Sequence, residues 1–370
     1  MEGFRPVARF FMGANTPQGF VGFPEELYSA GEGWQVFLIK GGPGCGKSTL
    51  MRSLAHRMAE VGQETEEIRC SSDPRSLDGV IFRDSRQCVL DATAPHILEP
   101  RYWDAVEMVL PVDGCIRAEE VAAHREAVME LTGECGRQHE RVRSFLAAAA
   151  SLLADGWRLA AEQTDRDKMH ATATQLVKRE LGSGGARPGR RQRRFLSAVT
   201  PEGLTVFQET LGALCPRIFS LEDESGAVAP LFLQAAEEQA RALGWDCLTC
   251  VCPLNPARTE HLLIPEAGVA FTTSNSYHKA DFPVYRRLHA ARFLPAESLR
   301  GYRPRLSFER RAVRELLREA ASAAAEAKRL HDRLESYYSP AMDWEAMAAL
   351  EKKTWDSMCR RLITQRSVKS

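Results

Sequence analysis

Most predictions for this chain follow from one short stretch of sequence: Gln35-Val-Phe-Leu-Ile-Lys-Gly-Gly-Pro-Gly-Cys-Gly-Lys-Ser-Thr-Leu50. Residues 36–39 are apolar, as in a buried strand, and residues 49–59 carry a helical pattern. Between them stands Gly41-x-x-x-x-Gly46-Lys47-Ser48, the Walker A pattern, in the strand–turn–helix context that this pattern requires. The run therefore predicts a loop that holds the phosphates of a nucleoside triphosphate.

The residue types in this loop suit a bound phosphate. Glycines let the backbone curl so that its N–H groups point inward, and the start of a helix adds positive potential. Lys47 is predicted to reach the β- and γ-phosphates of ATP, and the Ser48 hydroxyl is predicted to ligate Mg²⁺. The predicted nucleotide-binding residues are Gly41, Gly42, Pro43, Gly44, Cys45, Gly46, Lys47, Ser48 and Thr49.

A second motif, Cys88-Val-Leu-Asp91, is an apolar strand that ends in an acid, which is the Walker B pattern. Mg²⁺ favours oxygen ligands and usually keeps several waters, which a nearby carboxylate can hold. Asp91 is therefore predicted to hold Mg²⁺ together with Ser48 and to act in catalysis together with Lys47. The next residue is Ala92, so the water-activating glutamate of many P-loop ATPases is missing from its usual place.

His96 lies just past the strand that ends at Asp91, near the sheet edge where ligands bind in open α/β folds. It is a candidate catalytic residue that would contact phosphate or the attacking group. The alternative is a histidine that anchors its loop. Histidine recurs at the matching position, His278, and this recurrence favours the structural role.

The chain contains an internal repeat. Phe11-Met-Gly-Ala-Asn-Thr-Pro-Gln-Gly19 is echoed 184 residues later by Phe195-Leu-Ser-Ala-Val-Thr-Pro-Glu-Gly203. From Phe37 onward the offset is 182 residues, with sparser identities and a shared strand–loop–helix–strand pattern. The residues that find an identical partner at the offset of 184 are Phe11, Ala14, Thr16, Pro17, Gly19, Phe23, Glu25 and Leu27.

The second copy lacks the residues that would hold a phosphate. Asp223 and Glu224 stand where the first copy has Gly41 and Gly42, so a phosphate would meet like charge there. This half is therefore predicted not to bind a nucleotide by the P-loop mechanism. The other replacements are Lys47 by Ala229, Ser48 by Pro230 and Asp91 by Thr273.

Composition and the repeat together predict five segments. These are a P-loop core over residues 1–116, a helical hairpin over 117–182, a basic, glycine-containing linker over 183–193, a degenerate core over 194–304 and a second helical hairpin over 305–370. The predicted fold class is α/β. It consists of duplicated P-loop NTPase-like cores on mainly parallel sheets, each followed by an α-helical hairpin.

The bulk properties set further limits. Lys+Arg and Asp+Glu both number 49, which gives no overall case for binding nucleic acid or an anionic membrane. No apolar run approaches membrane-spanning length, and the region after Met1 lacks the apolar core of a signal peptide. We therefore expect a cytoplasmic protein whose ten cysteines are reduced, with Cys247, Cys250 and Cys252 buried in a strand rather than binding zinc.

Several of these motifs together resemble an uncharacterised family of bacterial twin P-loop ATPases, over nearly the whole chain. They are Phe11–Gly19, Gly41–Thr49, Cys70–Pro74, Leu77–Gly79 and the run from Asp91 to His96. Members of that family typically carry a P-loop in each half, so the resemblance implies a duplicated core. It also implies ATP binding at Lys47, Ser48 and Asp91, whereas the second half of this chain departs from the pattern.

The expected function is Mg²⁺-dependent ATP hydrolysis at one site in the first half. Two alternatives stay open at this point. One is a P-loop kinase for a small acceptor whose hydroxyl Asp73 or Asp78 positions, and it gains support from Ala92. The other is a nucleotide-gated module whose helical hairpins present a surface to a protein partner. The acceptor, the partner and the oligomeric state do not follow from the sequence.

Overall fold

The computed structural model of the chain describes residues 7–369, which fall into two compact units. The first unit combines the N-terminal residues as far as Gly13 with Gly22–Glu140 and with the residues from Ala323 onward. The second unit combines Ala14–Val21 with Arg141–Ser322. Each unit is therefore assembled from segments that lie far apart in the chain.

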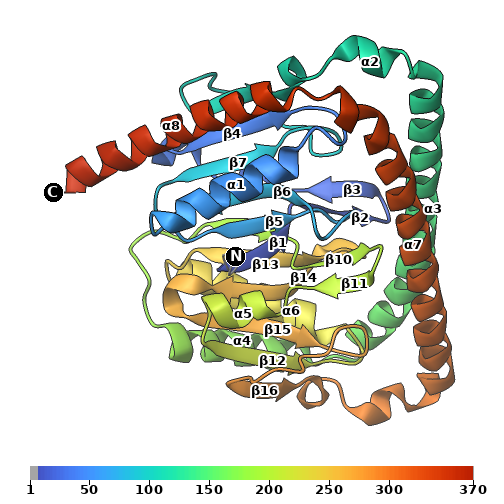
Figure 1. The fold of residues 1–370 in the computed structure, drawn as a ribbon. Helices are drawn as coiled ribbons and strands as arrows, with labels where there is room; N and C mark the ends of the chain where they lie inside the picture. The colour runs from blue at the N-terminus through green and yellow to red at the C-terminus, as the bar shows by residue number, and fades with distance from the viewer. Residues whose placement is uncertain (1–6, 370) are drawn as a thin grey trace. The chain divides into compact units, whose positions relative to one another are not determined.

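The first unit is built on a six-stranded mixed sheet (Figure 1). In spatial order its strands are β1 (Ala8–Phe11), β5 (Glu66–Arg69), β6 (Leu77–Phe82), β7 (Gln87–Asp91), β4 (Gln35–Lys40) and β8 (Glu107–Pro111). β1 and β5 are parallel, as are β7, β4 and β8, whereas β6 runs antiparallel to both of its neighbours. The carboxyl ends of β4 and β7 therefore meet at the same edge of the sheet.

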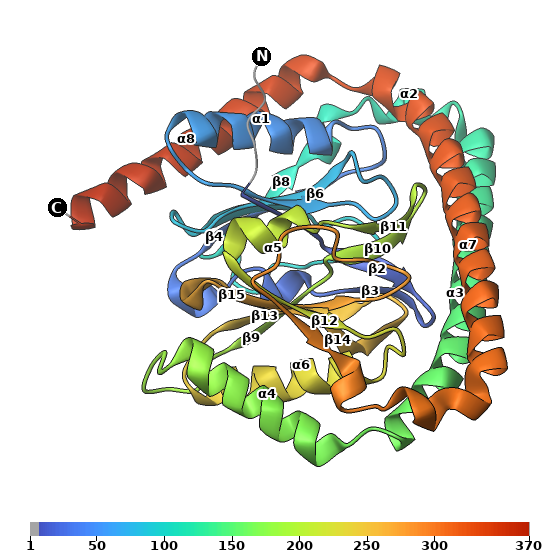
Figure 2. The same cartoon turned by 90° about the horizontal axis from the view of Figure 1, so that it is seen from below.

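The spacing of apolar residues explains where the helix after β4 packs. Helix α1 (Lys47–Glu60) has its buried side chains three or four residues apart, which places them on one face. Helix α8 (Trp344–Lys369) lies beside α1 and joins the same core through Met347 and Met358 (Figures 1 and 2). The buried side chains of α1 are Leu50, Met51, Leu54, Ala55 and Met58.

The second unit is built on another six-stranded mixed sheet. In spatial order its strands are β9 (Arg191–Arg194), β13 (Cys247–Cys252), β14 (Asn255–Ile264), β15 (Val269–Ser274), β12 (Arg217–Glu222) and β16 (Arg286–His289). Here β14 is the strand that runs antiparallel to both neighbours, and the remaining pairs are parallel. Counted along the chain within each unit, the strand order and the strand directions are the same in the two sheets.

Two helices of the second unit cover one face of this sheet. Helix α6 (Val228–Ala242) follows β12 as α1 follows β4, and α4 (Arg166–Leu181) packs beside it (Figure 2). Their buried side chains form one core with Phe219 and Phe271 of the sheet, whose rings stack at 5.1 Å between centroids.

The remaining α-helices and strands are α2 (Ala118–Ala122), α3 (Arg125–Glu162), α5 (Glu209–Leu214), α7 (Arg303–Tyr338), β2 (Gly13–Thr16), β3 (Gly19–Gly22), β10 (Ser197–Thr200) and β11 (Gly203–Val206). The 3-10 turns are η1 (Pro24–Glu26), η2 (Ala30–Glu32), η3 (Val112–Cys115), η4 (Pro265–Ala267), η5 (Ala290–Arg292), η6 (Ala296–Tyr302) and η7 (Ser339–Ala341).

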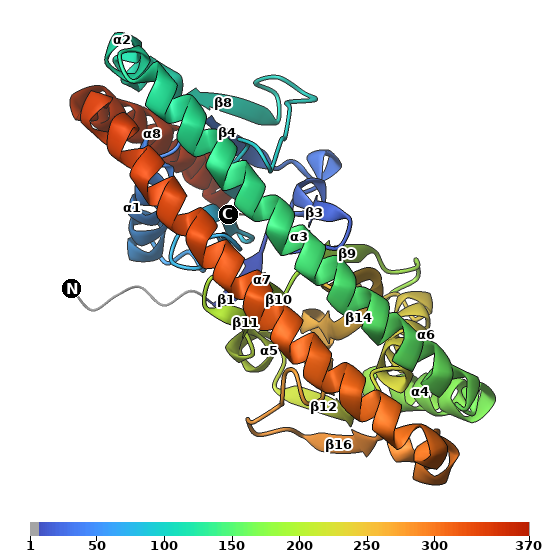
Figure 3. The same cartoon turned by 90° about the vertical axis from the view of Figure 1, so that its right-hand side faces the viewer.

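The two longest helices, α3 and α7, run antiparallel beside each other (Figure 3). In the first unit, Leu131 of α3 clusters with Leu330 of α7. In the second unit, the Asp155 carboxylate forms an ion pair with the Arg305 guanidinium. The division between the units falls inside both helices, so each helix contributes residues to both units.

Most of the predicted secondary structure is confirmed, including the strands that end at Asp91 and Cys252 and helices within 117–182 and 305–369. These helices do not pair as the predicted hairpins, because α4 packs beside α6 and α8 packs beside α1. The linker predicted over 183–193 is shorter, because Arg191–Arg194 forms β9 and pairs with β13. Its arginine-rich composition hid a strand in which the Arg194 side chain is almost wholly buried. The ten cysteines are all free thiols. None of the described helices has the length and the apolar character to cross a membrane.

Candidate phosphate-binding site

The loop after β4 and the end of β7 lie side by side at one edge of the first sheet. β4 and β7 are parallel neighbours, and Ile39 pairs with Asp91 in their register. α1 begins at Lys47, directly after the loop. The structure thereby brings together two residues that the sequence assigns to one site, because the Lys47 Nζ lies 3.6 Å from the Asp91 Oδ2.

Two glycines of the loop have backbone conformations that other residues rarely adopt. The φ angle is 67° at Gly44 and 79° at Gly46, both in the left-handed region. Side chains would also lack room, because a Cβ on Gly46 would lie 3.0 Å from the ring of Trp344. A Cβ on Gly42 would lie 3.0 Å from the ring of Tyr338. The loop therefore needs glycine both for its turn and for the close approach of its neighbours.

The Lys47 side chain folds back along the loop. Its ammonium group donates hydrogen bonds to the carbonyl oxygens of Gly41, at 2.7 Å, and Gly42, at 2.9 Å. Thr93, which follows β7, holds the same segment, since its hydroxyl also donates to the Gly41 carbonyl, at 3.1 Å. A cation is thus fixed against the loop at the carboxyl ends of two parallel strands, where ligands bind in open α/β sheets.

Asp91 and Ser48 supply oxygen atoms at this edge. Asp91 is 9 % exposed, and its Oδ1 accepts a hydrogen bond of 2.8 Å from the Thr93 N–H. Burial raises the pKa of Asp91 above its ordinary value, and the neighbouring Lys47 opposes that shift. The Ser48 hydroxyl accepts a hydrogen bond of 3.0 Å from the Leu77 N–H and retains a lone pair for another partner. This donor set fits a hard divalent cation, whose charge would offset the burial of Asp91.

The carboxyl end of α7 and the residues after it contact the loop. The Ser339 hydroxyl donates a hydrogen bond of 3.1 Å to the Gly44 carbonyl, across 295 positions of sequence. The Glu335 carboxylate is held by the His331 side chain and by the Gly44 backbone, and these hydrogen bonds keep its pKa below the usual range although burial opposes them. Sequence reasoning missed this cover, because no motif links residues so far apart.

His96 and Asp78 form a buried ion pair, with 2.9 Å between the His96 Nε2 and the Asp78 Oδ2. Burial lowers the pKa of His96, but the attraction of Asp78 more than offsets this effect, so the pKa is raised. The Cys70 Sγ lies within 4.8 Å of donor atoms of both residues, and these ligand types suit a transition metal. The positions that match this set in the second unit hold Cys252, Glu260 and His278, with 3.7 Å between the His278 Nε2 and the Glu260 Oε1.

The other residues predicted for this site differ in their exposure and in their hydrogen-bond partners. Cys45 is buried, and its thiol donates to the Gly42 carbonyl at 2.8 Å, whereas Thr49 is exposed. Asp73, offered above as a residue that positions an acceptor, already accepts a hydrogen bond from the Arg75 N–H at 3.1 Å and lies 3.4 Å from the Lys328 ammonium. Both carboxylates of the kinase alternative, Asp73 and Asp78, therefore have partners within the protein.

The corresponding loop of the second unit is filled by its own side chain. The Asp223 carboxylate is 1 % exposed and accepts hydrogen bonds from the backbone N–H groups of four residues, two in the loop before α6 and two in its first turn. The sequence analysis interpreted Asp223 as a charge that would repel a phosphate. In the structure its carboxylate instead occupies the place of the phosphate, because it accepts from the amides that would otherwise hold that group. The four donors are Ser225 and Gly226, each at 3.1 Å from Oδ1, and Val228 at 2.8 Å and Ala229 at 2.7 Å from Oδ2.

The start of α1 contrasts with the start of α6. Gly46 caps α1 and has no side chain that could accept from the first turn. Among the described residues, no carboxylate accepts a hydrogen bond from the N–H groups of Lys47, Ser48 or Thr49. These amide donors would otherwise be left to water or to a ligand. No protein-family model, no curated protein and no solved structure matches this chain.

Proposed function

We propose that the first unit binds one ATP with Mg²⁺ and hydrolyses it, and that the second unit is a copy of the same core that binds no nucleotide. In this proposal the two units descend from one P-loop NTPase-like core. The identical strand order and directions of the two six-stranded sheets support the duplication. The repeated sequence around Thr16 and Thr200 supports it independently.

The observation that carries the proposal is the contrast between the two loops. At the start of α1 the amides lack a carboxylate, and Lys47 and Asp91 stand 3.6 Å apart beside them. At the start of α6 a carboxylate, Asp223, takes the amides and the lysine is absent. A helix start with inward amides and a lysine favours an anionic phosphate. The first unit thus offers amide donors and a lysine to a phosphate. In the second unit a carboxylate of the protein itself accepts from the corresponding amides.

Each residue has a part in the proposed reaction. Lys47 would leave the carbonyls of Gly41 and Gly42 and pair with the β- and γ-phosphates, while Ser48 and Asp91 would hold Mg²⁺. When bound, Mg²⁺ neutralises the negative charge that develops on the phosphates. The buried Asp78 carboxylate lies 2.9 Å from the His96 Nε2 and thus holds the ring in place. We therefore propose that His96 anchors its loop, rather than serving as the general base.

The proposal is tested by titrating the protein with a slowly hydrolysed ATP analogue and Mg²⁺ in a calorimeter. We expect one nucleotide per chain, because Ala229 and Pro230 remove a charged contact and a backbone donor from the second loop. Phosphate release is then measured with ATP and no added acceptor. Steady release is the expected result. Tight binding without release would favour the gated module, and a stoichiometry of two would overturn the assignment of the second half.

Replacing Asp91 with asparagine is expected to lower turnover or Mg²⁺ affinity about 10–100-fold, the usual effect of losing a residue that orients a metal. ATP affinity should change much less, since the loop amides still face the phosphates. The measurements are phosphate release against Mg²⁺ concentration and calorimetric ATP binding. Asp113→Asn, an exposed carboxylate just after β8, is the matched control. An unchanged Mg²⁺ requirement in Asp91→Asn would make Asp91 a structural residue.

A further inference from the structure

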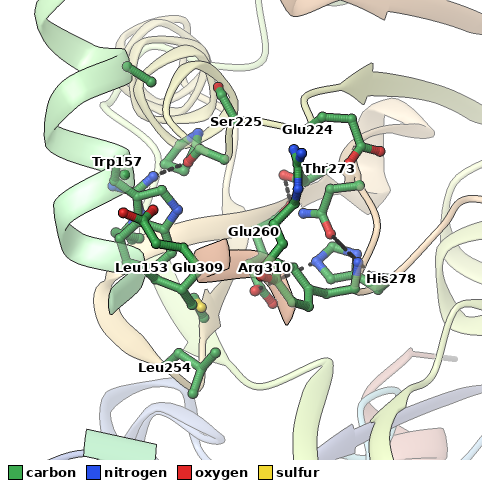
Figure 4. Close-up of a pocket in the computed structure, with 18 of the residues that line it drawn as sticks. Leu153, Trp157, Glu224, Ser225, Leu254, Glu260, Thr273, His278, Glu309 and Arg310 are labelled. Atoms are coloured by element: carbon green, nitrogen blue, oxygen red, sulfur yellow. Dashed lines mark hydrogen bonds and ion pairs between the residues drawn. The ribbon is translucent and has the colours of Figure 1, made fainter. Parts of the chain in front are cut away.

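The second unit contains a cavity of about 200 Å³ beside its filled loop (Figure 4). The loop after β12 and the end of β15 form one wall, and α3 and α7 form the other. Since a water needs about 10–15 Å³ measured in this way, the space corresponds to more than ten waters or to a small organic molecule. Much of the wall is apolar, with leucines from α3 and α7 and the indole of Trp157. Such cavities with a few placed polar groups are typical of ligand sites.

Two guanidinium groups line this cavity without a carboxylate partner. The Arg258 guanidinium lies 4.0 Å from the centre of the Trp157 ring and donates a hydrogen bond to the Gly226 carbonyl. Arg310 comes from α7 on the opposite wall. Among the described residues, no carboxylate forms an ion pair with either guanidinium. Burial lowers the pKa of Arg258, which shows that its charge is costly where it lies.

Two of the three acids that line the cavity have partners within the described residues. The Glu260 carboxylate accepts a hydrogen bond of 2.6 Å from the Ser197 hydroxyl and lies 3.7 Å from the His278 Nε2. Glu309 accepts from the Arg305 Nε at 3.3 Å. Glu224 is exposed to solvent. Asp223 and Glu260 attract Arg258 without forming an ion pair with it, so within the described residues the two guanidiniums keep N–H groups that no carboxylate accepts from.

Two further polar atoms point to a missing ligand. His278 lines the cavity and is 7 % exposed, yet its Nδ1 has no hydrogen-bond partner among the described residues. Tyr277 lines the same cavity, and its buried hydroxyl also lacks a partner within that part of the chain. Buried polar groups in native proteins are nearly always hydrogen-bonded, to protein or to something else. The two guanidiniums and the Tyr277 hydroxyl can donate hydrogen bonds, and such donors favour an acceptor-rich anion.

We propose that this cavity binds a small organic anion, in which an apolar or aromatic body carries one carboxylate or one monophosphate group. The anionic group would lie between Arg258 and Arg310, and the body would lie against the leucines and Trp157. A nucleotide held by the loop amides is excluded, because Asp223 occupies them. The second unit is then a ligand-binding module in its own right, and this assignment does not depend on ATP binding by the first unit.

The test uses the full chain and three probes of similar shape: 3-phenylpropionate, phenyl phosphate and the neutral 3-phenylpropionamide. Binding is followed by ligand-observed NMR and by calorimetry. At least one of the two anions is expected to bind, and the better one identifies the head group. The amide should bind about tenfold more weakly or worse, because it loses at least one charge-assisted hydrogen bond. Equal binding of amide and anion, or no binding of either anion, overturns the proposal.

The variants place the probe in the cavity. Arg310→Gln removes one guanidinium from the wall and should weaken binding of the anion about tenfold or more. Arg311→Gln removes the same charge from the next, exposed position of α7 and should leave binding unchanged. Thermal unfolding confirms that both variants are folded. Lys47→Ala should also bind the anion as the parent does. Undiminished binding by Arg310→Gln, or loss of binding in Lys47→Ala, shows that the anion binds elsewhere.

Discussion

Replacing Lys47 with alanine is expected to weaken ATP binding about 100-fold or more and to abolish measurable phosphate release. A lysine that reaches two phosphates makes two charge-assisted hydrogen bonds, each worth about 1.5–3 kcal/mol, and each 1.4 kcal/mol is about tenfold in affinity. The free energy of unfolding should change little, because among the described residues the Lys47 ammonium contacts only two loop carbonyls and Asp91. Asp91 can take up a proton when its cationic partner is removed. Calorimetry, phosphate release and thermal unfolding check these three statements.

The control for this variant is Lys40→Ala. Lys40 ends β4, just before the loop, and its ammonium pairs with the exposed Glu99. The Lys40→Ala substitution removes the same type of side chain close to the loop. The Lys40→Ala protein should nevertheless bind and hydrolyse ATP as the parent protein does. If Lys47→Ala retained full ATP affinity and turnover, the loop would not be the nucleotide site.

Replacing Asp223 with alanine is expected to destabilise the protein by about 3–5 kcal/mol. The change removes an almost wholly buried carboxylate and leaves four backbone N–H donors at the start of α6 without their acceptor. Asp223→Asn keeps one carbonyl oxygen as an acceptor and should destabilise the protein by about half as much as Asp223→Ala. The free energy of unfolding is measured by chemical denaturation, provided that the transition is two-state.

The matched control is Glu224→Ala, the exposed acid next in the chain, for which a change within about 0.5 kcal/mol is expected. Added formate should recover part of the loss in Asp223→Ala, since it restores the deleted carboxylate, and should not affect the parent protein. An Asp223→Ala protein as stable as the control would show that water satisfies these amides equally well.

The sequence predicted the parts of the fold that are set by local patterns. The buried strand before the loop, the helix after it and the strand ending at Asp91 each have an apolar period that local geometry dictates. The prediction of mainly parallel sheets is confirmed, whereas the one antiparallel strand of each sheet, β6 or β14, was not predicted. Strand direction depends on pairing partners rather than on composition, and so it was not visible beforehand.

The candidate site was predictable only where one motif holds its residues. Lys47 and Ser48 belong to a single loop, and Asp91 follows from the strand beside it. The contact of Ser339 with Gly44 spans 295 positions, and no short pattern encodes it. Asp223 was interpreted as a repelling charge, because a sequence does not show whether a carboxylate faces a ligand or replaces it. The side-chain direction decides this, and it depends on the turn that Gly226 completes with φ of 66°.

If the loop binds ATP as proposed, the contacts of the end of α7 with it would also set how fast the nucleotide enters. Glu335 and Ser339 engage the backbone of Gly44 from within the same chain, so an arriving triphosphate competes with contacts that are always present. The loop would then accept its ligand only during the fraction of time in which Glu335 had withdrawn, and the apparent affinity would fall by that fraction. The observed rate of binding should then level off at high nucleotide concentration, at the rate at which this carboxylate departs, instead of rising in proportion.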